Sequence, residues 1–479
     1  MKDYILTVGL EIHAELNTET KMFCDSKNDT DEKRPNINIC PVCMGYPGTL
    51  PVINKEAVRN VLRLGLSVGG EIADITLFDR KNYFYPDIPK GYQISQYKYP
   101  LVRGGSLLGV ALTRIHLEED TAKSIHPVKS LRDHGASDED DYSLLDFNRA
   151  GVPLVELVTE PVIHDPETAG QFAREFQLLL TYLNIAHANM EKGEMRVEAN
   201  ISVSRSDLKS SDSKVGPLGT KVEVKNLNSF RSVERAIKYE FDRQVKLLES
   251  GGEVLQETRG WNEEKEETFS QRVKEESHDY RYFPDPDLPK LFIKDVPEFD
   301  KDKLQVSLPE LPWQKRERYK KDFGLKGEDI EIYIREPEWG SLLEDAAALL
   351  KDRSLVQLAS NYIASDLKIR IPAESFAEVI RMVSAGTISS RGAKDILKIL
   401  ETEGGEPKFI AKERKLIQQS NVEELKAIAK KVIEENAEAV TEYKKGKLVS
   451  LQFLVGQAMK KTKGSANPQV LKDIFTKIL

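Results

Sequence analysis

The segment 194–203 constrains the fold more than any other part of the sequence. Its apolar and polar residues alternate without a break, which places the two kinds on opposite faces of a β-strand. Residues 8–15 and 221–225 alternate in the same way. A sheet of such strands packs one face in a core and leaves the other face for polar chemistry. In 194–203 the apolar residues are Met195, Val197, Ala199, Ile201 and Val203, and the polar ones are Glu194, Arg196, Glu198, Asn200 and Ser202.

Helical patterns lie between these strands and fill the second half of the chain. We expect helices at 55–68, 166–183 and 232–249, with Asp165 as the N-cap of the second and Pro166 in its first turn. After the Pro-rich stretch 284–297 the periodicity is helical, and 401–407 has the composition of a linker. The sequence predicts an α+β fold with an antiparallel-sheet domain at 1–295, an all-α domain at 296–405 and a small all-α tail domain at 406–479.

Composition narrows the class of protein. The chain has 479 residues, 40% hydrophobic, and only three Cys, too few for a disulfide framework. No apolar run is long enough to span a membrane, and the N-terminus has acidic residues where a signal peptide needs basic ones. We therefore expect a cytoplasmic protein with no membrane partner.

Several common catalytic motifs are absent. The sequence has no G-x-x-x-x-G-K-[ST] phosphate loop, no G-x-G-x-x-G after a strand, no G-x-S-x-G elbow and no H-E-x-x-H. It also lacks a Ser-rich amidase nucleophile and the G-x-C-x-G of a Cys glutaminase. Any ammonia that this chain uses must come from elsewhere.

Carboxylates and histidines on the expected strand faces remain. Glu11 and His13 leave the same face of one strand, Arg114, His116 and Glu118 leave one face of another, and Glu156 lies inside an apolar run. A carboxylate in such surroundings is neutral, paired or metal-bound. Oxygen ligands with one imidazole suit Mg²⁺ or Mn²⁺. The alternative is that each carboxylate pairs with a nearby Arg or Lys.

Two loops share an unusual composition. The stretch 80–96 combines cations, amides and four aromatic residues, and a similar pattern of residues recurs at 279–290. Such loops can stack a base and hold phosphates, or they can be packed Tyr/Pro loops. We expect the two loops to form the lips of one cleft, a hypothesis that distant positions in the structure would contradict.

The three cysteines have a partial zinc spacing. Cys40 and Cys43 form a C-x-x-C pair, and Cys24 stands upstream, with Asp25 or a His as the fourth ligand. The alternative is three reduced thiols.

Taken together, eight motifs resemble the B subunits of bacterial and organellar heterotrimeric tRNA-dependent amidotransferases, over essentially the whole chain. They are VGLEIH at 8–13, YPGTLP at 46–51, the stretch 80–96, HLEED at 116–120, DFNRAGVPLVE at 146–156, KNLNS at 225–229, DYRYFP at 279–284 and FLVGQ at 453–457.

The resemblance implies a ligase that works in two steps. ATP phosphorylates the side-chain carboxylate of Glu on tRNA(Gln), or of Asp on tRNA(Asn), and ammonia then displaces the phosphate. It also implies a cradle-shaped catalytic domain at 1–295 and a complex with an amidase A subunit and a small C subunit. The amidase would make the ammonia from glutamine, which agrees with the missing amidase motifs.

The resemblance also implies roles for individual residues. His13, Glu119 and Glu156 correspond to Mg²⁺ ligands, with Glu11 and Glu118 beside them, and Lys81 corresponds to a phosphate contact. We expect the remaining ATP-site or aminoacyl-site residues to be Tyr83, Tyr85, Lys90, Arg196, Glu198, Asn200, Lys225 and Asn228.

The sequence departs from the family pattern at three places. Ser26 stands where many members have a further Cys, which weakens the zinc assignment. Thr121 and Ala122 precede Lys123 where a Gly is usual, and Glu198 replaces the usual Asp.

Charge is distributed unevenly along the chain. The total of −8 argues against an RNA partner, but residues 406–479 hold 15 Lys and Arg against 9 Asp and Glu. Lys460, Lys461 and Lys463 cluster before a helix start at Asn467 and Pro468. We expect these lysines to bind tRNA. Two rival functions are a tRNA-binding or assembly protein without the kinase step and a free-standing ligase acting on a small acid.

Overall fold

The computed structural model describes residues 3–125, 143–206, 218–273, 280–418, 422–462 and 466–479. The chain divides into two compact units, Met1–Leu311 and Pro312–Leu479, each described by itself below. The predicted divisions at 295 and at 405 stay predictions. None of the described helices is both long enough and apolar enough to cross a membrane.

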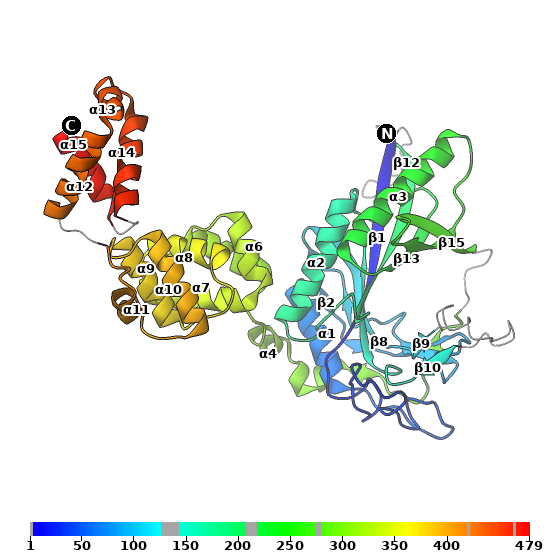
Figure 1. The fold of residues 1–479 in the computed structure, drawn as a ribbon. Coiled ribbons are helices and arrows are strands. Elements are labelled where there is room, and N and C mark those ends of the chain that lie inside the picture. The colour runs from blue at the N-terminus through cyan, green and yellow to red at the C-terminus, as the bar shows by residue number, and fades with distance from the viewer. Residues whose placement is uncertain (1–2, 126–142, 207–217, 274–279, 419–421, 463–465) are drawn as a thin grey trace, which may run out of the picture. The chain divides into compact units, whose positions relative to one another are not determined.

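The first unit is built on a ten-stranded sheet (Figure 1). Its order is β15-β14-β13-β12-β1-β11-β8-β6-β2, with β7 also paired to β8. Among the strand pairs that the structure describes in this sheet, β13–β14 is the parallel one and the others are antiparallel. The predicted α+β class with an antiparallel sheet is therefore confirmed, with this one parallel pair added. The strands are β1 (Tyr4–Glu15), β2 (Glu71–Ile72), β6 (Val102–Arg103), β7 (Ser106–Leu107), β8 (Val110–Glu119), β11 (Pro153–Thr159), β12 (Met195–Arg205), β13 (Val222–Leu227), β14 (Glu257–Asn262) and β15 (Glu267–Val273).

Strand alternation separates the two faces of this sheet. On β1 the side chains of Val8, Leu10 and Ile12 are fully buried, and on β12 those of Ala199 and Ile201 are buried as well. Helices α1 (Lys55–Ser67), α2 (Pro166–Tyr182) and α3 (Phe230–Glu249) contact the sheet and lie on one side of it in Figure 1. The alternate positions of the strands carry the polar residues.

The helix starts follow the capping residues in the sequence. Asp165 accepts a hydrogen bond from the Thr168 amide at 2.7 Å and precedes Pro166, as predicted. Ser229 caps α3 by accepting from the Ser232 amide at 3.0 Å. The helix therefore begins two residues before the position that the periodicity predicts.

Small sheets lie beside the large one. Strand β4 (Asp79–Asn82) pairs with β5 (Tyr92–Ser95) on one side and β16 (Phe283–Pro284) on the other. Strands β9 (Lys123–Ile125) and β10 (Leu144–Asp146) form one two-stranded sheet, and β3 (Ile75–Thr76) and β17 (Leu291–Phe292) form another. The unit ends with two 3₁₀ turns and α4 (Lys301–Val306).

The second unit is helical, as predicted. Its helices are α5 (Pro312–Arg318), α6 (Gly327–Arg335), α7 (Pro337–Leu350), α8 (Arg353–Ser365), α9 (Ala373–Ser384), α10 (Ser390–Thr402), α11 (Pro407–Glu413), α12 (Val422–Glu435), α13 (Ala437–Lys444), α14 (Leu448–Lys461) and α15 (Pro468–Ile478). The predicted linker 401–407 is shorter in the structure: 401 and 402 end α10, Pro407 begins α11, and the connection between them has Gly404 and Gly405 at positive φ. The helix that follows the connection, α11, contacts α9 and α10.

The last four helices enclose a core of their own. Leu425, Val432, Leu454, Leu471 and Phe475 are buried in it, and every residue packed against this core lies between 425 and 479. Asn467 caps α15 by accepting from the Gln469 and Val470 amides, and Pro468 occupies the first turn, as predicted.

Candidate active site

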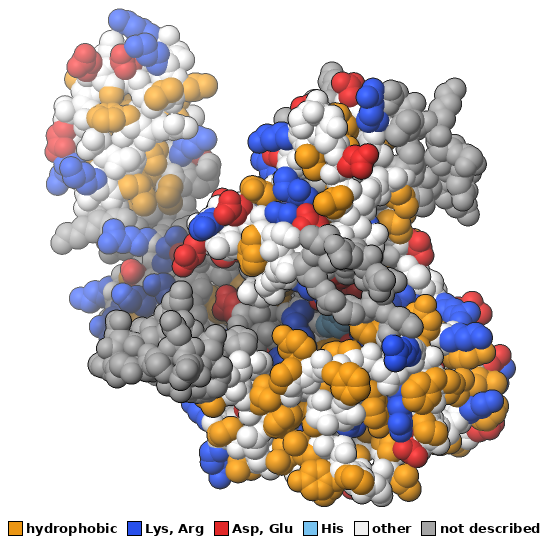
Figure 2. Space-filling model, turned by 90° about the vertical axis from the view of Figure 1, so that its right-hand side faces the viewer, with side chains coloured by type: hydrophobic (Ala, Val, Ile, Leu, Met, Phe, Trp, Pro, Cys, Tyr) orange, Lys and Arg blue, Asp and Glu red, His pale blue; other side chains and the backbone are white. Residues whose placement is uncertain are grey.

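A row of charged side chains crosses four strands on the polar face of the large sheet. His13 of β1 lies opposite Glu156 of β11 and Arg196 of β12, and Glu156 lies opposite His116 of β8. Directly opposed residues on neighbouring antiparallel strands project to the same side. The register thus gathers side chains that are up to 183 positions apart in the sequence. Figure 2 shows this side of the unit, with a histidine and cationic side chains visible in a hollow.

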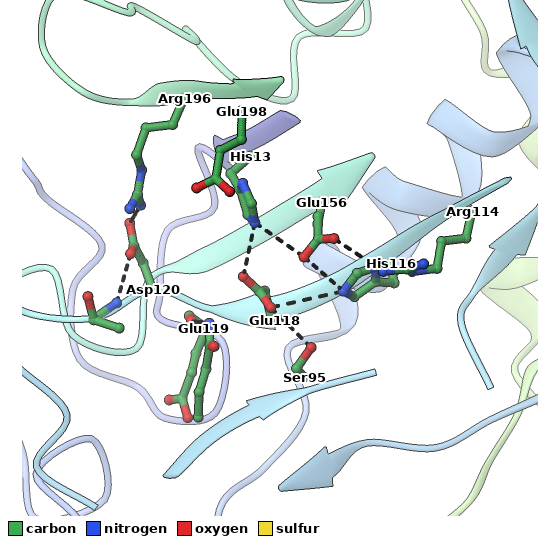
Figure 3. Close-up of polar contacts among 12 residues, drawn as sticks. His13, Ser95, Arg114, His116, Glu118, Glu119, Asp120, Glu156, Arg196 and Glu198 are labelled. Carbon is green, nitrogen blue, oxygen red and sulfur yellow. Dashed lines mark hydrogen bonds and ion pairs between the residues drawn. The ribbon is translucent and has the colours of Figure 1, made fainter. Parts of the chain in front are cut away.

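Glu156 is the centre of the row (Figure 3). Its carboxylate oxygen Oε2 lies 3.2 Å from His13 Nε2 and 3.4 Å from His116 Nε2. Arg114 Nη2 lies 3.4 Å from the other oxygen, Oε1. Glu118 completes the group, with Oε1 3.7 Å from His13 Nε2 and Oε2 accepting from the Ser95 hydroxyl at 3.0 Å.

The electrostatics of this group follow from burial and opposite charge. Burial opposes ionisation of Glu156, but the charges of His116 and His13 hold its pKa well below the usual range. Burial also opposes a charge on His13, yet Glu156 and then Glu118 raise its pKa to about 9. Without a metal, His13 is therefore a cation between two carboxylates at neutral pH.

Glu118, rather than Glu119, shares the space of His13 and Glu156. One ligand atom each from His13, Glu118 and Glu156 lies within 4.8 Å of the others. Glu119 leaves the opposite face of β8, where it forms an ion pair with Lys90 and accepts from the Ile94 amide at 2.9 Å. The expected ligand set has Glu119 with His13 and Glu156, whereas the structure groups Glu118 with these two residues, because strand alternation turns Glu119 to the other face of β8.

A second carboxylate group lies next along the same face. Glu11, Glu198 and Glu223 also have oxygens within 4.8 Å of one another. Lys225 Nζ lies 2.9 Å from Glu198 and 3.7 Å from Glu223, and the Asn200 amide donates to Glu11 at 2.8 Å. Burial, with Glu156 and Glu198 nearby, raises the pKa of Glu11. Of the expected residues here, Asn228 alone lies outside the group, exposed just after β13.

Arg196 has a different partner from the one expected. It forms an ion pair with the buried Asp120, which Arg149 also approaches at 3.5 Å. Glu15 lies beside this pair, and burial together with Asp120 raises the pKa of Glu15 to about 8. Arg196 thus pairs with Asp120, just after the end of β8, rather than with the group of His13, His116, Glu118 and Glu156, which we call the carboxylate row.

The two Tyr-rich loops lie side by side, although they are about 200 positions apart. In β4 and β16, Arg80 is opposite Phe283 and Asp79 is opposite Pro284. Lys81 Nζ lies 5.1 Å from the centroid of the Tyr280 ring. Burial lowers the pKa of Lys81, but Glu118, Tyr282, Glu156 and Tyr280 together outweigh burial and raise that pKa. The two loops are therefore close together, as the hypothesis of one cleft requires, and they are paired as strands. That they form the lips of one cleft stays a prediction.

The remaining expected residues of the first loop are dispersed. Tyr83 makes an edge contact with Tyr280 at 6.0 Å, whereas Tyr85 is 66% exposed. Lys90 and Glu119 line a cavity of about 220 Å³ together with Cys24, Cys43 and Tyr46.

The three cysteines meet in space. Their sulfur atoms lie within 4.8 Å of one another, and the buried Lys21 Nζ is 3.9 Å from Cys43 Sγ. A hydrogen bond from Cys24 and the charge of Lys21 lower the pKa of the Cys43 thiol. Ser26 Oγ, at the position of the missing fourth Cys, lies 3.9 Å from the same sulfur.

The expected RNA-binding lysines lie at the end of α14. Lys460 is exposed, and Lys461 pairs with Glu435. Lys463 lies outside the residues that the structure describes.

Sequence reasoning gave no role to several residues that complete the site. His116, Arg114 and Asp120 appear in the strand pattern, but their partners depend on a register that local sequence does not encode. Glu223 has the same alternation signal as its neighbour Lys225. For Tyr280 and Tyr282 the only indication in the sequence was that their segment resembles the stretch 80–96.

Comparison with known proteins decides the family. Residues 6–297 match the family model described as the GatB/GatE catalytic domain, and residues 344–479 match one described as the GatB domain. The chain is 39% identical over its full length to the B subunit of the aspartyl/glutamyl-tRNA(Asn/Gln) amidotransferase of Gloeothece citriformis, covering 98% of that protein. The chain belongs to this family of amidotransferase B subunits.

Two further relatives with the same name have nearly the same sequence identity to this chain. The B subunit of Thermoanaerobacter pseudethanolicus is 40% identical, with 98% of both chains covered. That of Thermomicrobium roseum is 40% identical, with 100% of this chain and 99% of the relative covered. The family resemblance expected from the eight motifs is confirmed. The carboxylate row lies inside the catalytic-domain match, and Lys460 and Lys461 lie inside the other.

Proposed function

We propose that this chain is the ligase component that converts Glu-tRNA(Gln), Asp-tRNA(Asn) or both into the amidated forms, using ATP and ammonia derived from glutamine. The relatives are named as amidotransferases acting on these tRNAs. The observation that carries the proposal is the group of His13, Glu118 and Glu156 beside Lys81. It offers metal ligands and a cation in one place, which phosphoryl transfer requires.

The proposed reaction has two steps. An oxygen of the substrate's side-chain carboxylate attacks the γ-phosphorus of ATP, the bond to the bridging oxygen breaks, and ADP leaves with that electron pair. Ammonia then attacks the carbonyl carbon of the acyl phosphate, loses a proton, and inorganic phosphate leaves. The first step brings a carboxylate toward a triphosphate, so positive groups must offset their repulsion. Lys81, which stays protonated, fills this role at the phosphates.

The donor set fits a magnesium ion. Two carboxylates and one imidazole each supply one atom within 4.8 Å of the others. The carboxylate oxygens are the hard ligands that Mg²⁺ prefers, and three protein ligands leave the other octahedral positions for water and phosphate oxygens. Bound there, Mg²⁺ would neutralise phosphate charge. Arg114 and His116 hold Glu156, and Ser95 holds Glu118. Binding requires His13 to lose the proton that it carries in the metal-free site.

Partners follow from what the chain lacks. The relatives are named as B subunits, and this sequence contains no amidase nucleophile motif. We infer a heterotrimer with an amidase A subunit and a small C subunit. The basic segment 406–479, with Lys460 and Lys461 on α14, is the proposed contact for the tRNA.

We infer a structural zinc at Cys24, Cys40 and Cys43. The support is the convergence of three sulfur atoms within 4.8 Å of one another, since zinc favours Cys sulfur as a ligand. Metal analysis of the purified chain should find about one zinc per chain, and Cys40→Ser should remove it. If the purified wild-type chain contains no zinc, the three cysteines are reduced thiols and the zinc inference is wrong.

The experiment for the ligase function uses the assembled complex. With Glu-tRNA(Gln) and ATP, the wild type should release phosphate and form Gln-tRNA(Gln). His13→Ala and Glu156→Ala should each lower this turnover by about 100-fold or more, with tRNA affinity retained. Unchanged turnover in both variants would contradict the metal assignment. Tight tRNA binding by a wild type that consumes no ATP would favour the tRNA-binding or assembly protein.

A further inference from the structure

Four tyrosines from two distant segments form one aromatic wall. The rings of Tyr97 and Tyr282 are stacked, with centroids 4.4 Å apart and planes 9° apart. Tyr280 meets Tyr282 edge-to-face at 6.0 Å, and Tyr83 meets Tyr280 in the same way at 6.0 Å. We call Tyr83, Tyr97, Tyr280 and Tyr282 the tyrosine wall.

The tyrosine wall is held by the backbone and by buried charge. The backbone amide of Tyr97 donates to the Asp79 carboxylate at 3.1 Å. Arg80 pairs with Asp285 at 2.7 Å and with Asp287 at 3.0 Å, which ties the segment after Tyr282 to β4. Preorganised rings of this kind lose little freedom when a ligand stacks on them.

Packing alone does not explain this arrangement. Tyr97 is 60% exposed, and the other three rings are half-buried. The apolar core of the unit lies between the large sheet and helices α1 to α3, where Val8, Leu10 and Ile12 are fully buried. The stacked pair therefore stabilises a surface, and an exposed aromatic face is what a nucleobase needs for stacking.

The wall begins beside the proposed phosphate-binding residues. Lys81 Nζ lies 5.1 Å from the centroid of Tyr280. Strand β5 ends at Ser95, whose hydroxyl donates to Glu118 at 3.0 Å, and Tyr97 follows two residues later. A phosphate at Lys81 thus has an aromatic surface on one side and the carboxylate row on the other.

We propose that Tyr97, Tyr280 and Tyr282 form a subsite that stacks an adenine base whose phosphates are bound at Lys81. The inference deepens the proposed function, on which it rests. Adenine has two sources in that reaction: ATP itself and the terminal adenosine of the tRNA acceptor end. The chemistry of recognition is the same, since adenine from either source presents the same π-face for stacking.

The test uses the full-length chain in its complex and equilibrium binding, which does not depend on turnover. The probes are ATP with Mg²⁺, an RNA minihelix with a single-stranded 3′-terminal adenosine, and inorganic tripolyphosphate, which has no base. Tyr97→Leu and Tyr282→Leu remove aromatic faces, whereas Tyr282→Phe keeps one. Tyr99→Leu is the matched control, because Tyr99 is 39% exposed in the same segment and no described ring stacks on it.

Both leucine variants should weaken binding of one adenine probe by about tenfold, with Tyr282→Phe and Tyr99→Leu near wild type. Weaker ATP binding assigns the wall to the nucleotide, and weaker minihelix binding assigns it to the tRNA end. Tripolyphosphate affinity should stay unchanged in every variant.

Wild-type affinity for both adenine probes in Tyr97→Leu and Tyr282→Leu would overturn the inference while leaving the ligase function intact. Equal loss of tripolyphosphate binding would overturn it too, because the damage would then lie at the phosphate site. A wild type that binds neither adenine probe would remove the proposed function itself and the inference with it. Tyr97 is mostly exposed, so its leucine variant stays informative even if Tyr282→Leu unfolds.

Discussion

Two adjacent glutamates at the end of β8 have different partners because successive side chains of a strand point to opposite faces. Glu118 faces His13 and Glu156, and Glu119 faces Lys90. We expect Glu118→Gln to raise the Mg²⁺ concentration needed for half-maximal ATP turnover by about 100-fold, because a metal ligand loses its charge. Glu119→Gln should leave this Mg²⁺ requirement within a factor of about 3. A magnesium titration of both variants measures this requirement. A larger increase in Glu119→Gln than in Glu118→Gln would indicate that Glu119 is the ligand.

Glu15 makes stability depend on pH. Burial and the nearby Asp120 raise its pKa from 4.5 to about 8 in the folded chain. The folded state therefore holds this proton more tightly than the unfolded state. Its contribution to stability is complete below about pH 4.5 and is lost as the pH rises toward 8.

Glu15→Gln should remove this dependence, because the amide mimics the protonated acid. The melting temperature of the variant relative to the wild type should rise between pH 5.5 and pH 8.5 by roughly several degrees. Glu19→Gln, at an exposed position of the same segment, should show no such trend. A constant difference across this range would mean that Glu15 is ionised in the fold.

At the scale of elements, the sequence predicted which side chains share a face of a strand better than it predicted which strands pair with each other. Alternation placed Arg114, His116 and Glu118 on one face, and capping residues located the starts of α2 and α15. His13 and Glu156 are 143 positions apart in the sequence. The register that places them opposite each other is set by the packing of the whole sheet, so local sequence does not predict it. The expectation that Glu119 is a ligand came from family resemblance, whereas strand alternation places its side chain beside Lys90 and places Glu118 beside His13.

The pairing of β4 with β16 depends on one buried ion pair. The Asp285 side chain is fully buried and Arg80 is its partner at 2.7 Å. Arg80→Ala leaves that carboxylate buried without its cation, although the Asp287 amide still donates to it at 2.8 Å, and should destabilise the first unit by about 3–5 kcal/mol. Lys55→Ala removes a pair with Glu298 in which both side chains are more than half exposed, and it should cost under about 1 kcal/mol. Chemical denaturation of both variants measures the contrast, and equal effects would show that Asp285 finds water or another donor.

At the scale of the whole molecule, the residues proposed for chemistry and those proposed for tRNA binding lie in different units. The carboxylate row belongs to the unit Met1–Leu311, and the lysines of α14 belong to Pro312–Leu479. The helices α12 to α15 enclose their own core, whereas α11 contacts α9 and α10. A chain that ends at residue 418 should therefore keep its ATP affinity within about twofold and lose tRNA affinity by about tenfold. Equal losses of both would show that the last four helices support the catalytic unit.

Two neighbouring lysines test whether the end of α14 binds the tRNA backbone. Lys460 is exposed with no ion pair among the residues that the structure describes, and Lys461 already pairs with Glu435. A lysine that neutralises a phosphate releases a counterion, so its loss reduces the slope of log affinity against log salt by about one. Lys460→Ala should show this full change, and Lys461→Ala a smaller one, since Glu435 competes for its charge. Titrations of tRNA at several salt concentrations measure both slopes, and unchanged slopes in the two variants would place the RNA contact on another surface of the chain.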